Sequence, residues 1–425
     1  MKTNLIENAA IGEKYIYAQH ESGLKIYICP KEAYTSAYAI FGTRYGSIDT
    51  KFAVDGGPMQ EVPAGIAHFL EHKLFESEDG DAFTRYAKTG ASANAYTSFD
   101  RTCYLFSCSD RFEESFDILL DFVQSPYFTK ETVDKEQGII GQEIRMYDDS
   151  PSWRVLFNML EGMFQTHPVK IDIAGTVESI AEIDADLLYR CYNAFYNLNN
   201  MFICVAGQVD PDRLLEQIEK GLKPVRPVTV GRGRFEEQDG VICPYVSQDF
   251  AIAVPLFCLG FKEKCERPER TLKEILSTEI LLDLLIGPAS RLYEQLIESK
   301  LINANFDTEY FNGYGYAVPL LSGESSQPEQ VRDAVFAEID RLQREGIDPS
   351  LFEAARRAKY GRSVMQFNSV ERIASGMVEA AMTGSGLFED LAILQALTLD
   401  DVAARLDTLR ADRAVLSVVR PADAK

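Results

Sequence analysis

The stretch Gly65-Ile-Ala-His-Phe-Leu-Glu-His-Lys-Leu-Phe75 decides how the rest of the chain is interpreted. It contains His68 and His72, four residues apart, with Glu71 directly before the second histidine. On an α-helix, side chains four apart leave the same face, so both imidazoles can bind one metal ion. A carboxylate on that side suits a general base that acts on a metal-activated water. The stretch therefore predicts a helix over 63–76 that carries two zinc ligands and a base.

The order H-x-x-E-H is the inverted arrangement of the zinc-peptidase motif. The chain has only four histidines among its 425 residues. Shuffling this composition would produce the arrangement about 0.006 times per chain, so chance is a poor explanation of it. The competing interpretation is an ordinary helix on which hydrogen bonds hold both histidines, and we consider it the weaker one.

Composition excludes several classes of protein. A length of 425 residues predicts at least two domains. The net charge of −22 argues against nucleic acid or an anionic membrane surface as a partner. The eight cysteines contain no C-x-x-C pair, and several lie in apolar runs, which is typical of reduced, buried thiols. The most apolar segment, 250–261, contains Pro255 and is too short to span a membrane. With no signal peptide evident, a cytoplasmic location is expected.

Two halves of the chain repeat the same order of strands and helices. Residues 1–222 and 249–425 are the predicted halves, and 223–248, rich in proline, glycine and charge, is the predicted linker. This order predicts an internal duplication within an α+β fold. The expected strands are 23–29, 36–43, 93–108, 200–209, 249–262, 303–311, 314–323 and 414–419. The other expected helices are 81–88, 111–124, 130–146, a helix that resumes after the interruption at 150–153 and runs through Phe164, 185–196, 211–222, 270–286, 289–300, 327–345, 349–383 and 395–409.

A catalytic zinc site takes three protein ligands and keeps one position open. His20, in a polar run, and His167, before a proline, could each supply the third, although histidines in such places are common without metal. Glu136 and Glu143 are better candidates, because seven residues are about two helical turns and both side chains face one way. One could bind zinc while the other supports a histidine. Because further acidic residues lie nearby, the two glutamates could also belong to an acidic helix face that is simply exposed to solvent. Spacing alone does not show which of the two would bind zinc.

The chain resembles the pitrilysin/insulinase family of inverted zinc metallopeptidases, which includes mitochondrial processing peptidase. The resemblance rests on His68-x-x-Glu71-His72 and on the later stretch Glu136-Gln-Gly-Ile-Ile-Gly-Gln-Glu143. It implies that His68, His72 and Glu143 bind zinc. It also implies that Glu71 is the catalytic base and that Glu136 supports the site. Bacterial members of the family are resembled most closely, in 71–81, 138–149 and 167–179.

A second feature shared with the family is Gly90-Ala-Ser-Ala-Asn94-Ala-Tyr-Thr-Ser-Phe-Asp-Arg-Thr-Cys-Tyr104. In relatives this strand lies at a sheet edge beside the metal and pairs with the substrate backbone. An unpaired edge aligns an extended peptide by strand addition. Asn94 is the residue expected to make a polar contact with substrate, and an ordinary sheet strand is the alternative.

The second half departs from the catalytic pattern. No histidine follows His167, and the stretch Leu276-Ser-Thr-Glu279-Ile280, where the repeat would place the motif, is apolar at both ligand positions. The resemblance also implies an arginine and a tyrosine from this half near the substrate. Arg291 with Tyr310, Tyr314 or Tyr316 could supply them, but the local pattern fits poorly and no pair is assigned.

These observations predict a zinc-dependent metalloendopeptidase that cleaves peptides or short unfolded polypeptides. The resemblance implies two homologous α+β halves, each a mainly antiparallel sheet packed with helices, facing each other across a cavity. It also implies an enclosed chamber formed by a homodimer, or by a heterodimer with a sister chain that lacks the motif. A non-proteolytic, peptide-binding or regulatory subunit of such a heterodimer is the main alternative. A metal-dependent hydrolase of non-peptide substrates has only the generic chemistry in its favour.

Overall fold

The structure, a computed structural model, describes residues 1–78 and 80–422 and divides into two compact units. Unit 1 consists of Met1–Ile144, Asp172–Gly233 and Val364–Phe388. Unit 2 consists of Arg145–Ile171, Arg234–Ser363 and Glu389–Lys425. Each unit therefore includes one segment taken from the opposite half of the sequence. The domain boundaries at 222 and 249 stay a prediction about the repeat.

Unit 1 is built on a seven-stranded sheet in the order β1-β2-β3-β11-β4-β10-β9. Neighbouring strands are antiparallel except for β3 and β11, which are parallel. The central strand β11 is buried along its whole length because both of its faces are covered. The strands are β1 (Lys2–Asn8), β2 (Glu13–Gln19), β3 (Lys25–Pro30), β4 (Ala37–Thr43), β9 (Ser92–Thr97), β10 (Thr102–Cys108) and β11 (Met201–Gly207).

Unit 2 is built on a five-stranded sheet in the order β13-β17-β14-β16-β15. The pair β13 and β17 is parallel and the others are antiparallel. This order and these directions repeat the order β3-β11-β4-β10-β9 of unit 1, which supports the predicted duplication. The α+β fold with two sheet-and-helix domains is confirmed. The strands are β13 (Tyr245–Phe250), β14 (Leu256–Phe261), β15 (Asp307–Gly313), β16 (Tyr316–Glu324) and β17 (Ala414–Pro421).

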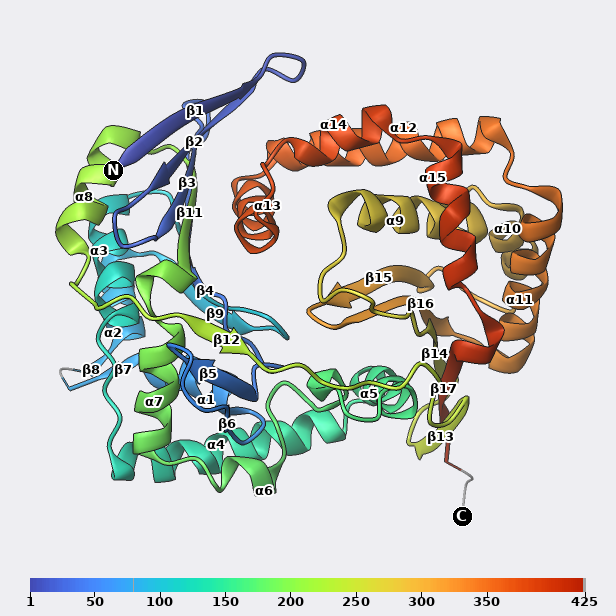
Figure 1. The fold of residues 1–425 in the computed structure, drawn as a ribbon, viewed down its shortest axis with the longest axis horizontal. Helices are drawn as coiled ribbons and strands as arrows, with labels where there is room; N and C mark the ends of the chain where they lie inside the picture. Colours follow the sequence, from blue (N-terminus) through green and yellow to red (C-terminus); the bar gives the residue numbers. More distant parts are fainter. Residues whose placement is uncertain (79, 423–425) are drawn as a thin grey trace. The chain divides into compact units, whose positions relative to one another are not determined.

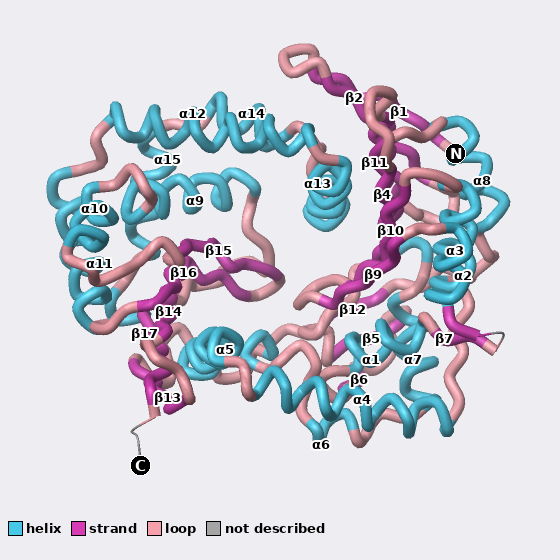
Figure 2. Tube along the Cα trace, turned by 180° about the vertical axis from the view of Figure 1, so that it is seen from behind, coloured by secondary structure: helices cyan, strands magenta, loops and turns pink. Residues whose placement is uncertain are grey.

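Helices cover both faces of the sheet in unit 1. Figures 1 and 2 show α2, α3 and α8 on one face and α13 on the other, where α13 packs against β3, β4 and β11. The large apolar core lies on the α2–α3 face and includes Phe41, Tyr104 and Phe116. The helices of this unit are α1 (Ile66–Leu74), α2 (Ala82–Thr89), α3 (Phe112–Val123), α4 (Lys130–Asp148, which ends in unit 2), α6 (Val177–Ile180), α7 (Ala185–Phe195), α8 (Pro211–Gly221) and α13 (Val370–Thr383).

Unit 2 has the same two-faced arrangement. Phe257, Leu259 and Phe261 of β14 point into the core that α9 and α11 cover. On the opposite face, Gly260 lies so close to Met159 of α5 that an added Cβ would be 2.6 Å from its sulfur atom. The helices are α5 (Pro151–Met163), α9 (Leu272–Ile286), α10 (Arg291–Glu298), α11 (Pro328–Glu345), α12 (Pro349–Met365), α14 (Glu389–Ala396) and α15 (Leu399–Ala403).

The two halves of the sequence therefore exchange one helix each. Helix α5, from the first half, packs against β13, β14 and β17 of unit 2. Helix α13, from the second half, packs against the sheet of unit 1. The exchange explains why the expected helical region 349–383 is broken. Helix α12 ends at Met365, a short 3₁₀ turn follows, and the Ser369 side chain caps the new helix by accepting a hydrogen bond from the amide of Arg372.

Further strands differ from the expected pattern. The long β signal over 93–108 forms a hairpin, because the chain turns between Thr97 and Thr102. The strands β1 and β2 were not expected from the sequence. Small strands form two minor sheets: β5 (Lys51–Val54), β6 (Gln60–Glu61) and β12 (Val230–Arg232) form one, and β7 (Glu76–Ser77) and β8 (Gly80–Asp81) form the other. Among the described residues, no helix has the length and hydropathy needed to cross a membrane.

One carboxylate holds the part of the predicted linker that lies within unit 2. Glu237 accepts hydrogen bonds from three successive backbone N–H groups, those of Gln165, Thr166 and His167, at 2.8–2.9 Å. The ammonium group of the buried Lys262 lies 2.9 Å from the same carboxylate. Burial alone would raise the pKa of Glu237, but these donors outweigh it and lower the pKa to about 2.

Candidate metal centre

A close crossing of two backbone segments fixes the start of the motif helix α1. Gly65 precedes the helix with φ of 89°, and a Cβ at this position would lie 2.3 Å from the carbonyl oxygen of Ala174. The approach is reciprocal, because a Cβ added at Gly175 would lie 2.5 Å from the carbonyl oxygen of Ala64. The hydroxyl of Ser179 also donates to that oxygen at 2.8 Å. Glycine is needed at both positions, because any side chain would push the helix away from the segment that orients it.

The two motif histidines project from one face of α1, as their spacing predicts. Their ring centroids are 4.6 Å apart. His68 is buried, and His72 is partly exposed. The opposite side of the helix is held in the core by Ile66, Phe69 and Leu70. The apolar residues of the stretch therefore fix how the imidazoles point.

Helix α4 brings both candidate glutamates to the histidines. Oε1 of Glu143 lies 3.7 Å from Nε2 of His68, and its Oε2 lies 3.4 Å from Nε2 of His72. Glu136 approaches from the other side, with Oε1 2.9 Å from Nδ1 of His72. Since a carboxylate only accepts, His72 donates this hydrogen bond. The geometry thus distinguishes the two glutamates: Glu143 faces both Nε2 atoms, whereas Glu136 holds the far nitrogen of one ring.

A zinc ion fits the donor atoms of this group. In the part of the chain that the structure describes, His68, His72 and Glu143 are the one set of three such side chains whose ligand atoms all lie within 4.8 Å of one another. Tetrahedral ligands about 2.0–2.1 Å from zinc are separated from each other by roughly 3.4 Å. The separations of 3.4 and 3.7 Å are close to that value. Two imidazoles and a carboxylate are also a donor set of catalytic zinc sites.

The surroundings give the two histidines different electrostatics. Burial, together with the nearby His72, lowers the pKa of His68 to about 3, so its imidazole is neutral, the form that binds a metal. Burial also acts to lower the pKa of His72, but the hydrogen bond to Glu136 and the neighbouring carboxylates outweigh it and raise the pKa. Nδ1 of His68 is buried and has no hydrogen-bond partner among the described residues.

Glu71 lies beside the group and is held by a residue that sequence reasoning missed. The Thr97 hydroxyl donates a hydrogen bond of 2.6 Å to Oε2 of Glu71. Burial raises the pKa of the Glu71 carboxyl and outweighs the opposing effects of Thr97 and His72. A raised carboxyl pKa suits a group that must both accept and release a proton near neutral pH. Thr97 lies in the stretch 90–104. The one signal that could have identified it is that it belongs to the face of this strand that packs against the motif helix.

Strand β9 forms one end of the unit 1 sheet, and among the described residues β10 is the one strand that pairs with it. Ala93, Ala95 and Thr97 share the partly buried face of the strand, which packs against α1. Asn94 points from the opposite, exposed face, and its Oδ1 accepts a hydrogen bond from the amide of Ala95. The structure therefore does not bring the Asn94 side chain to the histidines. Its contact with substrate stays a prediction.

In unit 2, helix α9 packs against the edge strand β15 as α1 packs against β9. The positions expected to match the ligands are the buried Leu276 and Ile280. Glu279 is paired with Lys359 of α12 at 2.8 Å, and the next turn of α9 is joined to α12 by another ion pair. This unit thus joins its two helices by ion pairs where unit 1 gathers His68, His72 and Glu143.

The residues considered for further roles lie elsewhere. His20 contacts Ser22 and Glu219, away from the motif. His167 is buried in unit 2, where Nδ1 accepts from the amide of Val169 and Nε2 bonds the carbonyl of Tyr314. Neither histidine joins the metal group. The remaining candidates lie in unit 2, where Arg291 begins α10, Tyr310 is buried against Arg405, and Tyr316 packs against His167.

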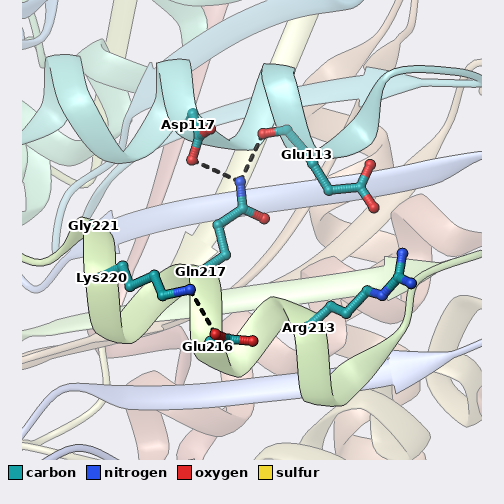
Figure 3. A pocket seen from close by; sticks show the side chains of 7 residues that line it. All are labelled: Glu113, Asp117, Arg213, Glu216, Gln217, Lys220 and Gly221. Carbon is teal, nitrogen blue, oxygen red and sulfur yellow. Dashed lines mark hydrogen bonds and ion pairs between the residues drawn. The ribbon is translucent and has the colours of Figure 1, made fainter.

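A separate hollow lies on the surface of unit 1. It has a volume of about 470 Å³ between α3 and α8, and no predicted site residue lines it. Figure 3 shows the amide of Gln217 reaching across it to the backbone oxygen of Glu113 and the carboxylate of Asp117, each at 2.7 Å. The hollow is thus crossed by a polar contact between its two helices.

Comparisons with known proteins agree with this geometry. The family description "Insulinase (Peptidase family M16)" matches residues 49–177, and "Peptidase M16 inactive domain" matches residues 182–359. The chain is 40% identical over 423 residues to the uncharacterized zinc protease YmfH of Bacillus subtilis (strain 168), covering 98% of this chain and 99% of that one. A second zinc protease of that organism, YmxG, is 24% identical and covers 84% of this chain and 86% of its own length.

Solved structures show the same relationship. An M16-like peptidase of Alicyclobacillus acidocaldarius matches with a TM-score of 0.94 at 35% identity, covering 98% of this chain and 100% of that chain. A protease of Helicobacter pylori matches with a TM-score of 0.83 at 18% identity, covering 96% of this chain and all of that one, which is a likeness of fold. The resemblance inferred from the motifs is confirmed. The chain belongs to the insulinase family, peptidase family M16, as a member with an intact H-x-x-E-H motif.

Proposed function

We propose that this protein is a zinc-dependent endopeptidase that cleaves peptides or short unfolded polypeptides. Family membership and the intact motif make it a zinc metallopeptidase; the type of substrate and the role of each residue are the proposal. The observation that carries it is the convergence of His68, His72 and Glu143 within 4.8 Å, with Glu71 held beside them. A purely structural helix would have no reason to gather four such groups at one point.

Each side chain has a distinct part in this proposal. His68, His72 and Glu143 would hold the zinc ion, which, when bound, supplies a Lewis acid that polarises a carbonyl group and lowers the pKa of a water molecule. Glu71 takes the proton from the attacking water and then passes it to the leaving amine. Glu136 holds His72 in the tautomer that leaves Nε2 free as a ligand.

The edge strand β9 is the proposed binding place for the peptide. Among the described residues no strand lies on its outer edge, and it adjoins α1, so an extended chain could add to the sheet within reach of Glu71. Strand addition recognises the main chain, which suits a protease that accepts many sequences. Asn94 is proposed to contact such a peptide from the exposed face of the strand.

We assign the chemistry to the first half, 1–222, and a non-catalytic part to the second, 249–425. We further propose that two chains pair to enclose a chamber, either as a homodimer or as a heterodimer with a sister chain lacking the motif. The cytoplasm is the proposed location, and it fits eight cysteines that are all free thiols, six of them buried. A non-proteolytic, peptide-binding role would not require the three zinc-binding side chains and the base that this chain carries.

The test is the variant Glu71→Gln, assayed against a library of quenched fluorescent peptides. We expect the variant to bind about one zinc ion per chain, because no ligand is changed, and to lose hydrolysis. Glu78→Gln, which removes an exposed carboxylate a short distance after the helix, serves as the control and should keep full activity. Wild-type rates in Glu71→Gln would refute the assignment of the base. Both proteins should also be assayed with a motif-lacking sister chain, if a neighbouring gene encodes one.

A further inference from the structure

The hydroxyl of Thr97 connects the proposed base to the edge strand. Thr97 is the last residue of β9, and its Oγ1 lies 2.6 Å from Oε2 of Glu71. Hydrogen bonds to a carboxylate at this distance are short and strong. The bond therefore joins α1 to β9 at the point where the metal group and the unpaired strand edge meet.

The direction of this hydrogen bond follows from counting protons. A threonine hydroxyl has one proton to donate, and a carboxylate only accepts. The hydroxyl of Thr102 lies 3.4 Å from that of Thr97, but it is buried and donates to the carbonyl oxygen of Tyr45 at 2.9 Å. Thr102 therefore does not compete for the Glu71 carboxylate, and the proton of Thr97 is given to Oε2.

The sheet holds Thr97 in a defined position. Thr97 is paired with Thr102 in the β9–β10 register, and Ala95, on the same face of β9, packs against the core of unit 1. Because the hydroxyl is attached to a paired strand, it cannot follow Glu71 if the carboxylate turns. It thus fixes one oxygen of a side chain that would otherwise have three rotatable bonds.

We propose that Thr97 is the positioning residue of the base, with its hydroxyl holding the carboxylate of Glu71 beside the metal group. This rests on the proposed function of Glu71. The backbone N–H of Thr97 also donates a hydrogen bond to the Glu71 carboxylate, so the variants below test what the hydroxyl adds. The hydrogen bond from the hydroxyl sets the distance between the base and a peptide paired with β9.

The experiment compares Thr97→Val, which removes the donor but keeps the branched shape, with Thr97→Ser, which keeps the donor. We expect Thr97→Val to lower kcat by about 10- to 100-fold through a misplaced base, with little change in KM. Thr97→Ser should have a kcat close to that of the wild type. Zinc content should be unchanged in both, because no ligand is altered, and both should stay folded at the assay temperature, because strand pairing is kept.

Two further variants separate positioning from general damage. Thr308→Val removes a hydroxyl from β15, the edge strand of the other sheet, and should leave kcat unchanged. In a Glu71→Gln background, Thr97→Val should cause no further loss, because a residue that acts through Glu71 has no effect once the base is absent.

The outcomes distinguish this inference from the proposed function. Wild-type turnover in Glu71→Gln overturns the function itself. Suppose that Glu71→Gln is inactive and that Thr97→Val is folded, loaded with zinc and turns over at the wild-type rate. Then only the role of Thr97 is overturned. That role is likewise overturned if Thr97→Ser is as slow as Thr97→Val. Should Thr97→Val fail to fold, turnover kept by Thr97→Ser and lost by Thr97→Ala supports the inference, and equal turnover in those two overturns it.

Discussion

Nδ1 of His72 lies 2.9 Å from a carboxylate oxygen of Glu136, which is buried on α4. The pair fixes the tautomer of His72 and makes its other nitrogen a better metal donor. We therefore predict that Glu136→Gln weakens zinc affinity by about 10- to 100-fold, measured by competition with a chromophoric chelator. Glu131→Gln, on the exposed first turn of the same helix, should bind zinc like the wild type. Equal affinities in the two variants would show that Glu136 does not support the site.

Removing a ligand should remove the metal. We predict that His68→Ala binds almost no zinc after loading and dialysis, because two remaining donors do not complete a catalytic site. Metal content is measured by atomic absorption, with His20→Ala as the control, since the His20 side chain bonds Ser22 and Glu219, away from the motif. Chelation of the wild-type protein should abolish peptide hydrolysis, and added zinc should restore it. A His68→Ala protein with one zinc per chain would refute the site.

The glycine at the start of α1 should tolerate no side chain. Gly65→Ala places a methyl group 2.3 Å from a backbone oxygen in a left-handed conformation, so we predict a loss of about 2–4 kcal/mol in the free energy of unfolding. Gly138→Ala is the matched control, because this helical glycine of α4 has nothing within 4 Å of an added Cβ. It should stabilise the protein by about 0.5–1 kcal/mol. Both values are measured by urea denaturation. A Gly65→Ala variant as stable as the wild type would contradict the close approach of Gly65 to Ala174.

The stability contributed by the hydrogen bonds to Glu237 should depend on pH in a defined direction. Its pKa is about 2 in the folded protein, below the ordinary value of about 4.3, so the ionised form favours folding. That contribution is complete above the unfolded pKa and is lost as pH falls from there toward the folded pKa. We predict that Glu237→Gln lowers the urea midpoint by a constant amount from pH 7 to 5.5, and that the deficit shrinks below pH 4.5. A deficit that grows in acid would contradict this assignment.

The sequence was sufficient to predict that His68, His72 and the two glutamates come together, but not how each glutamate faces the histidines. The spacing of His68 and His72 specifies a helix face, and this prediction holds because the other face of α1 is apolar and buried. Glu136 and Glu143 could not be separated by spacing alone, since both point from α4 to the same side. Only their distances from the two rings distinguish them, and these depend on how α4 crosses α1.

Two features were beyond the sequence for physical reasons. Thr97 contacts Glu71 from 26 residues further along the chain, with helix α2 between them, and no local pattern encodes such a contact. The exchange of α5 and α13 was equally hidden. An amphipathic helix shows that it has an apolar face, but its sequence does not show which of two similar sheets that face will cover.

The exchanged helices have a consequence for how the chain is made. The sheet of unit 1 is complete once β11 has been synthesised, yet the helix that covers its second face, α13 (Val370–Thr383), is synthesised only after the strands β13 to β16 of unit 2. Until then that apolar face is open to water or to chaperones, and its closure involves contacts of very long sequence separation, which form slowly. If the chain arose by gene duplication, the half-length ancestor would have been a swapped dimer in which each copy covered the other's sheet. Fusion of the two genes would then have made the partner's helix part of the same molecule.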